Sequence, residues 1–114
     1  MRPASLRGRI LFERVSRKGK RFHSEYLQLR IYKNNLGFNR AGFIIPKKAV
    51  RLAVDRNRIR RLLKESFRTM PHEIEQGYDI VVFVRCAPDI NRLIFVQNSL
   101  IGLLRKSRLI KQTS

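Results

Sequence analysis

Residues 54–68 read "VDRNRIRRLLKESFR", a stretch that places several arginines among a few aliphatic side chains. At about 100° per residue, the apolar positions fall on one stripe of a helix and the cations on the other side. The apolar stripe holds Ile59, Leu62, Leu63, Phe67 and Met70, and the opposite side holds Asn57, Arg61, Lys64 and Arg68, flanked by Arg56 and Arg60. The pattern predicts an amphipathic helix with one buried face and one open cationic face.

The signs of the charges on this helix decide between two interpretations. Most charge-rich helix faces are simply solvated, and they mix signs so that pairs form three or four residues apart. Here Glu65 is almost alone among the cations. Each like-charge pair at this spacing costs about 0.2–0.5 kcal/mol of helix stability. A bound phosphate backbone would instead make these charges favourable, because each neutralised phosphate releases counterions. Arginine also suits bidentate contact with phosphate. The face therefore favours a polyanion partner, with a merely solvated face as the alternative.

Composition limits the size of the protein and the class of its partner. The chain has 114 residues, of which 43% are hydrophobic, enough for one compact core. We therefore expect residues 1–114 to form a single domain. Lys plus Arg is 26 against 8 acids, a net charge of +18 that implies nucleic acid or an anionic membrane. No apolar run approaches the roughly 20 residues of a spanning helix, which disfavours the membrane.

The N-terminal segment and the single cysteine bear on the compartment. Arg7, Arg9 and Arg14 interrupt the segment, so it lacks the unbroken apolar run of a secretory signal. Cys86 is the only cysteine, which excludes an internal disulfide and any multi-cysteine zinc site. We expect a cytoplasmic protein.

Hydrophobic periodicity predicts elements on both sides of the opening stretch. Helical spacing covers residues 6–17, before a glycine, and again residues 93–104, before the basic "RKSR". Strict alternation in "EYLQLRIYK", residues 25–33, predicts a strand with one buried face. Short buried strands are predicted over "AGFIIP", residues 41–46, and "YDIVVFVR", residues 78–85.

The open face of the alternating strand indicates which nucleic acid is bound. It presents Gln28, Arg30 and Tyr32, and Phe12 lies on the basic helix that precedes it. Aromatic and arginine side chains together suit stacking on unpaired bases, which favours single-stranded RNA. The alternative is that Phe12 and Tyr32 are ordinary core or boundary residues.

The longer run "KKAVRLAVDRNRIRRLLKESFR", Lys47–Arg68, resembles the signature of the bacterial ribonuclease P protein subunit. That signature is a paired lysine, a short connector, then Arg-Asn-Arg, a hydrophobic residue and two basic residues. "LFERVSRKG" is similar to the family's N-terminal helix, "AGFIIPKK" to the strand before the motif and "YDIVVFVR" to the strand after it. The resemblance thus extends along nearly the whole chain.

The resemblance implies a fold and an activity. The fold is α+β, an α/β sandwich of order α-β-β-β-α-β-α with a mixed four-stranded sheet, similar to a ribosomal protein. Its parallel strands are joined by a left-handed βαβ crossover, although the general rule predicts the opposite hand. In the family a large RNA using Mg²⁺ cleaves the 5′ leader from precursor tRNA. The protein assists as a monomer, one per catalytic RNA, with no catalytic residue or metal site of its own.

The resemblance also implies two sets of contact residues. The single-stranded leader would lie in a cleft between the N-terminal helix and the sheet, where this chain has Ser16 in place of a second aromatic of many relatives. The leader contacts would be Phe12, Gln28, Arg30 and Tyr32. The catalytic RNA contacts would be Lys47, Lys48, Arg56, Asn57, Arg58, Arg60, Arg61, Lys64 and Arg68.

Two other functions are compatible with a small, basic chain. A protein-only ribonuclease could use two histidines as general acid and base, but His23 and His72 lie in no recognisable catalytic setting. The carboxylates Asp55, Glu65 and Asp79 are too scattered to predict a metal site. A ribosomal protein or RNA chaperone would share the size, the charge and even the fold. Only the motif within Lys47–Arg68 separates those proteins from the ribonuclease P subunit.

Overall fold

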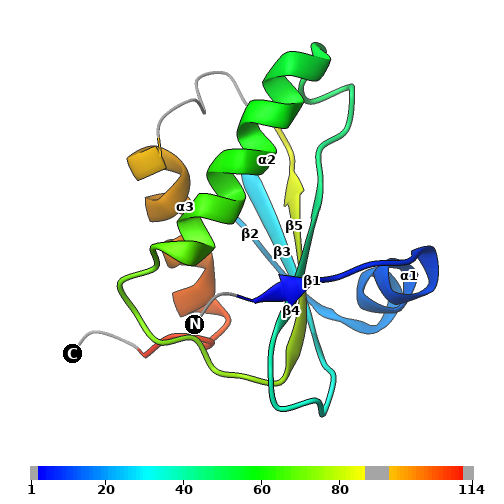
Figure 1. The fold of residues 1–114 in the computed structure, drawn as a ribbon, viewed down its shortest axis with the longest axis vertical. Coiled ribbons are helices and arrows are strands. Elements are labelled where there is room, and N and C mark those ends of the chain that lie inside the picture. Colours follow the sequence, from blue (N-terminus) through cyan, green and yellow to red (C-terminus); the bar gives the residue numbers. More distant parts are fainter. Residues whose placement is uncertain (1–2, 87–92, 112–114) are drawn as a thin grey trace.

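A mixed β-sheet lies at the centre of the molecule, with helices on both of its faces (Figure 1). The computed structural model describes residues 3–86 and 93–111. The elements follow the order β1 (Ala4–Ser5), α1 (Arg9–Lys18), β2 (Lys20–His23), β3 (Leu27–Lys33), β4 (Arg40–Ile44), α2 (Ala53–Arg68), β5 (Tyr78–Val84) and α3 (Leu93–Lys106).

The sheet has five strands in the described residues, so the prediction of four strands was wrong. The strand order is β1-β4-β5-β3-β2, with β1 and β5 parallel to β4 and the other neighbours antiparallel. The additional strand is β1, held by the Ala4 amide donating to the Asn39 carbonyl and the Leu6 amide to the Ala41 carbonyl, each at 2.9 Å. Two residues are too few for alternation to reveal a strand.

The remaining order of helices and strands is as predicted, with small shifts at the ends. The first helix begins at Arg9 rather than near Leu6, because Leu6 continues from β1 and is buried. Gly8, at φ 96°, makes the turn into the helix in a backbone region that favours glycine. The adjacent parallel strands β4 and β5 are joined through α2. The left-handed sense of this crossover stays a prediction.

The larger part of the core lies between the sheet and the two helices α2 and α3. The predicted apolar stripe of α2 is confirmed, with Ile59, Leu63 and Phe67 buried and Leu62 and Met70 half-buried against the core. From the strands, alternate residues such as Leu29 and Ile80 face this layer. Burying each such side chain contributes about 1.5–3 kcal/mol, which fixes α2 to the sheet by its apolar side.

Of the helices in the described residues, α1 is the one that packs against the opposite face of the sheet (Figure 1). Val15 of α1, Leu6 and Val81 are buried there, with Phe12 and Tyr32 packed around them. In β3 the alternation is confirmed: Leu27, Leu29 and Ile31 are buried on the α2 and α3 side, while Gln28, Arg30 and Tyr32 are half-buried on the α1 side. Each face of the sheet therefore carries one of the two predicted contact sets.

Candidate RNA-binding surfaces

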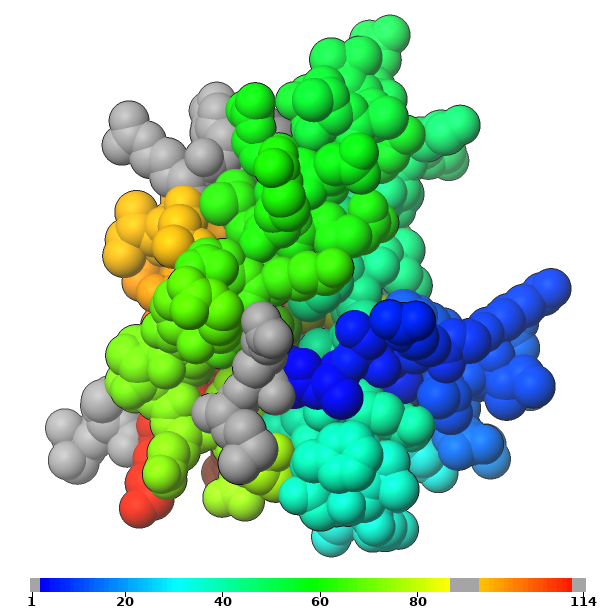
Figure 2. All heavy atoms as spheres, viewed as in Figure 1, coloured from blue at the N-terminus to red at the C-terminus, as the bar shows by residue number. Residues whose placement is uncertain are grey.

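The cationic side of α2 is open to solvent and, with the turn that precedes the helix, forms what we call the α2 surface. The space-filling view shows α2 as a ridge across this side of the molecule (Figure 2). Among its residues only Arg56 and Arg60 are half-buried, and the others are exposed. The α2 surface comprises Lys47, Lys48, Arg56, Asn57, Arg58, Arg60, Arg61, Lys64 and Arg68.

Two arginines of the α2 surface also have partners within the chain. Arg56 donates from Nη1 to the carbonyls of Val50 and Arg51, at 2.9 and 2.8 Å. These bonds fix the connector, the segment between Lys48 and the first residue of α2, to the start of the helix. Arg68 pairs with Glu65, and their hydrogen bond raises the pKa of Arg68. Sequence reasoning missed the role of Arg56, because a hydrogen bond to a main-chain carbonyl leaves no trace in charge or periodicity. The pair of Arg68 with Glu65 has the three-residue spacing at which side chains on a helix meet.

The other cations of the α2 surface have no ion-pair partner in the described part of the chain. Arg58, Arg61 and Lys64 are exposed on the helix and take part in none of its salt bridges. Their charges are held close together only because the helix packs by its opposite side. Such a surface gains free energy when a polyanion replaces its counterions.

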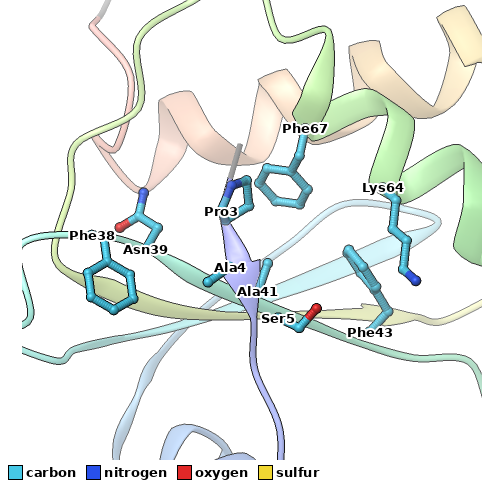
Figure 3. Close-up of a pocket in the computed structure, with 9 residues that line it drawn as sticks. All are labelled: Pro3, Ala4, Ser5, Phe38, Asn39, Ala41, Phe43, Lys64 and Phe67. Atoms are coloured by element: carbon cyan, nitrogen blue, oxygen red, sulfur yellow. The ribbon is translucent and has the colours of Figure 1, made fainter. Parts of the chain in front are cut away.

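A hollow of about 510 Å³ lies beside this surface, between α2, β4 and β1 (Figure 3). Lys64 extends from α2 next to the ring of Phe43, and Ser5 of β1 lies close by (Figure 3). The rings of Phe43 and Phe67 lie 6.1 Å apart between their centroids. The aromatic pair holds this half of α2 against the edge of the sheet and so fixes where Lys64 emerges.

The four predicted leader contacts lie together on the α1 side of the sheet, and we call this set, Phe12, Gln28, Arg30 and Tyr32, the α1 face. Phe12 comes from the helix and the other three from β3. The Phe12 ring lies directly over Gly42 of β4, since a Cβ built on Gly42 would come within 2.3 Å of Phe12 Cζ. Glycine is therefore required at residue 42 for the end of the Phe12 ring to come this close to β4.

Arg30 is fixed within the α1 face by contacts on three sides. Its Nε donates to Gln28 Oε1 at 2.6 Å and its Nη1 to Ser16 Oγ at 2.9 Å. The guanidinium also lies 5.2 Å from the centroid of the Phe83 ring, a cation–π contact. Ser16 thus serves as an acceptor for Arg30. Only the fold reveals this, because the two residues are 14 positions apart.

A second arginine lies beside Arg30 and makes this region strongly positive. Arg21 of β2 pairs in register with Arg30 and donates from Nη2 to the Ser16 carbonyl at 2.8 Å. Burial, and then repulsion by Arg21, lower the pKa of Arg30. An arginine remains charged at neutral pH even so. An anion entering between the two guanidinium groups would relieve their repulsion.

The buried carboxylate Asp79 lies on this side of the sheet and accepts hydrogen bonds from two residues. Arg40 contacts both of its oxygens at 2.7 Å, and Asn34 donates to Oδ1 at 2.9 Å. The hydrogen bond to Asp79 raises the pKa of Arg40. Asp79 of β5 pairs with Tyr32 of β3 on one side and with Arg40 of β4 on the other. The ion pair of Arg40 with Asp79 therefore lies next to Tyr32, at the end of the α1 face.

Residues 3–86 and 93–111 contain no group of three or more His, Cys, Asp or Glu side chains that could hold a metal ion. His23 and His72 are both exposed, one on edge strand β2 and the other in the loop before β5. In the same ranges, none of the helices combines the length and the apolar character needed to cross a bilayer.

Comparison with known proteins places the chain in a family. The family model described as "Ribonuclease P" matches residues 1–108. The chain belongs to the bacterial ribonuclease P protein family. The ribonuclease P protein component of Natranaerobius thermophilus is 35% identical over 108 residues, covering 95% of this chain and 93% of the relative. That of Clostridium kluyveri is 39% identical over 102 residues, covering 88% and 90%.

Solved structures of ribonuclease P proteins share the fold. The Staphylococcus aureus protein superposes with a TM-score of 0.82 at 25% identity, covering 94% of this chain and 97% of that one. The Thermotoga maritima protein gives 0.79 at 29% identity, covering 90% and 96%. The resemblance drawn from the run Lys47–Arg68 and its flanking segments is thereby confirmed.

Membership in this family fixes the biological role at a coarse level. The chain is a subunit of the ribonuclease P endoribonuclease, a ribonucleoprotein that processes the 5′ ends of tRNA. Its partner is accordingly the ribonuclease P RNA. The ribosomal-protein and RNA-chaperone alternatives are set aside by this result. The assignment of individual residues to either RNA stays a prediction.

Proposed function

We propose that this ribonuclease P protein binds the catalytic RNA through the α2 surface and the 5′ leader of precursor tRNA through the α1 face. The observation that carries the proposal is the placement of the two sets on opposite faces of one sheet (Figure 1). A protein built in this way can contact two RNA segments at the same time without competition between them. It would thereby hold the leader while the catalytic RNA cuts.

Charge supports the assignment of the α2 surface to a structured RNA. Arg58, Arg61 and Lys64 are exposed and have no ion-pair partner among the described residues. Contacts of this kind with phosphate oxygens position a protein on a nucleic acid and give a strong dependence on salt. Arg56 would act in part indirectly, because its bonds to Val50 and Arg51 fix the connector that carries Lys47 and Lys48.

Geometry supports the assignment of the α1 face to a single strand. The ring of Phe12 on α1 lies on the same side of the sheet as the phenol of Tyr32 and the guanidinium of Arg30 on β3. Unpaired bases stack on such groups, whereas the bases of a duplex are not accessible to them. The half-buried Gln28, which accepts from Arg30, keeps a polar amide on the same surface.

Catalysis in this proposal belongs to the RNA, which would hold the Mg²⁺ ions. The buried carboxylate Asp79 is already committed to Arg40 and Asn34. We further propose a cytoplasmic monomer, one per catalytic RNA, in which residues 1–114 act as a single RNA-binding domain. The left-handed sense of the β4-α2-β5 crossover belongs to the same proposal.

Cleavage of precursor tRNA tests this function. The protein alone, a matching catalytic RNA alone and the two together would be compared at low Mg²⁺ concentration. We expect no cleavage by the protein alone and faster cleavage by the complex than by the RNA alone. Cleavage by the protein alone, or an RNA whose rate the protein leaves unchanged, would contradict the proposal.

A further inference from the structure

A third cationic region lies along the edge strand β2 of the sheet. It is distinct from the α2 surface and borders the α1 face. A hollow of about 500 Å³ opens there, and we call it the β2 edge pocket. Half of its lining side chains are cations, and none is a carboxylate. The cations are Lys18, Lys20, Lys33, Lys106 and Arg108.

The fold gathers these charges from separate parts of the chain. Lys18 ends α1, Lys20 begins β2, Lys33 ends β3, and Lys106 and Arg108 lie at the end of α3 and in the turn after it. All five side chains are exposed. Like charges brought together in this way repel one another unless an anion lies among them. The arrangement is therefore that of a binding site for an anion.

The chemistry of the lining indicates phosphate on a chain rather than a small acid. Lysine ammonium groups are mobile point charges that follow a phosphate backbone without demanding one geometry. The floor includes the aromatic residues Phe22, Tyr32 and Tyr78, on which a base or ribose can pack. A groove that joins cations to aromatic side chains is typical of single-stranded nucleic acid binding.

The α1 face and the β2 edge pocket are continuous around one edge strand. Tyr32 belongs to the α1 face and also lines the pocket. Along β2, Arg21 pairs in register with Arg30 and contacts Ser16 on the α1 side, while its neighbour Lys20 lines the pocket. An RNA strand that passes from the α1 face to the β2 edge pocket would therefore cross only strand β2.

We propose that the β2 edge pocket binds the phosphate backbone of the 5′ leader of precursor tRNA, beyond the segment held by the α1 face. The proposal rests on the leader role of the α1 face proposed above. The catalytic RNA is the less favoured occupant, because α2 packs on β4 through Phe67 and Phe43, towards the other edge of the sheet. A long leader would then bind more tightly than a short one.

The test compares two charge-matched double variants in the assembled holoenzyme. Lys20→Gln with Lys33→Gln removes two charges from the pocket, and Lys47→Gln with Lys48→Gln removes two from the α2 surface. All four lysines are exposed, so both variants should fold, which thermal unfolding checks. The affinity for cleavage-resistant precursor tRNA is measured with leaders of about 5 and about 15 nucleotides, spanning the site sizes of single-strand binders.

We expect the pocket variant to bind the long-leader substrate about tenfold more weakly at moderate salt, and the short-leader substrate as the wild type does. The slope of log affinity against log salt should fall by about 1.4 for the long leader, at about 0.7 per phosphate contact. The Lys47 and Lys48 variant should affect both leader lengths equally.

Three outcomes would overturn the proposal: equal losses by the pocket variant for both leader lengths, no loss for either, or weaker assembly of the pocket variant with the catalytic RNA. A Phe12→Ala holoenzyme keeps this result separate from the proposed function. If Phe12→Ala weakens both leader lengths while the pocket variant weakens neither, the α1 face holds the leader and the pocket does not. If Phe12→Ala spares both, the leader role of the α1 face fails by itself.

Discussion

The α1 face and the α2 surface are both cationic, yet they are built in different ways. On the α1 face, Arg30 is fixed by Gln28 and Ser16, and the ring of Phe12 lies against Gly42. On the α2 surface, cations such as Arg61 and Lys64 extend into solvent from a helix anchored by its other side. The first region depends on geometry and the second on charge. Substitutions should therefore affect folding as well as binding in the first region, and chiefly salt-dependent binding in the second.

The largest expected effect is that of Asp79→Ala, at the end of the α1 face. Asp79 is 1% exposed and carries a two-point contact with Arg40. Removing it leaves that guanidinium partly buried without its partner, so the free energy of unfolding should fall by about 3 kcal/mol. Chemical denaturation measures this. The control Glu13→Ala removes an exposed pair with Arg9 and should cost under about 0.5 kcal/mol. Equal losses for both variants would refute the expectation.

Gly42→Ala should have the next largest effect. The added methyl group would meet the Phe12 ring, so the ring and α1 must shift, at a cost of about 2 kcal/mol. Denaturation in two backgrounds isolates the cause. In a Phe12→Leu background, where the side chain is smaller, the same substitution should cost less. An identical cost in both backgrounds would mean that the ring is not what requires glycine at residue 42.

Ser16→Ala should have a smaller effect, about 1 kcal/mol in the free energy of unfolding. The variant loses the hydroxyl that accepts from Arg30, although the Ser16 carbonyl still accepts from Arg21. Ser16→Thr keeps a hydroxyl and serves as the matched control in the same denaturation experiment. If Ser16→Thr is destabilised as much as Ser16→Ala, the hydroxyl is not responsible.

Arg61→Gln combined with Lys64→Gln should change stability least, by under about 0.5 kcal/mol. Neither side chain has a salt-bridge partner in the described residues. Their removal should instead lower the salt slope of binding to the catalytic RNA by about 1 to 2. A salt titration of assembly measures the slope, and an unchanged slope would show that this side of α2 does not contact the RNA.

The elements with clear periodicity could be predicted from the sequence, and those without it could not. The stripe of Ile59, Leu63 and Phe67 predicted α2, and the alternation around Leu29 predicted β3, because each pattern repeats often enough to be recognised. Strand β1 has two exposed residues and is stabilised by backbone bonds to a segment far along the chain. No local pattern encodes such pairing.

The candidate sites divide in the same way. Cations on one helix, such as Arg61 and Lys64, are visible in sequence because the spacing alone places them together. The contact of Ser16 with Arg30, and the meeting of Lys18 with Arg108 in one pocket, depend on the tertiary fold. Arg56 combines both kinds of signal: its charge is visible in the sequence, but its hydrogen bonds to the connector carbonyls of Val50 and Arg51 are visible only in the structure.

The most direct test of the division between the two faces is a comparison of two variants in two assays. Phe12→Ala and the Arg61→Gln, Lys64→Gln double variant would each be measured for assembly with the catalytic RNA and for holoenzyme affinity to leader-bearing and leaderless tRNA. We predict that Phe12→Ala weakens only leader-bearing binding, by about 1–3 kcal/mol, and that the double variant weakens only assembly. If both variants weaken the same step, or if Phe12→Ala affects both tRNAs equally, the two-face account is contradicted.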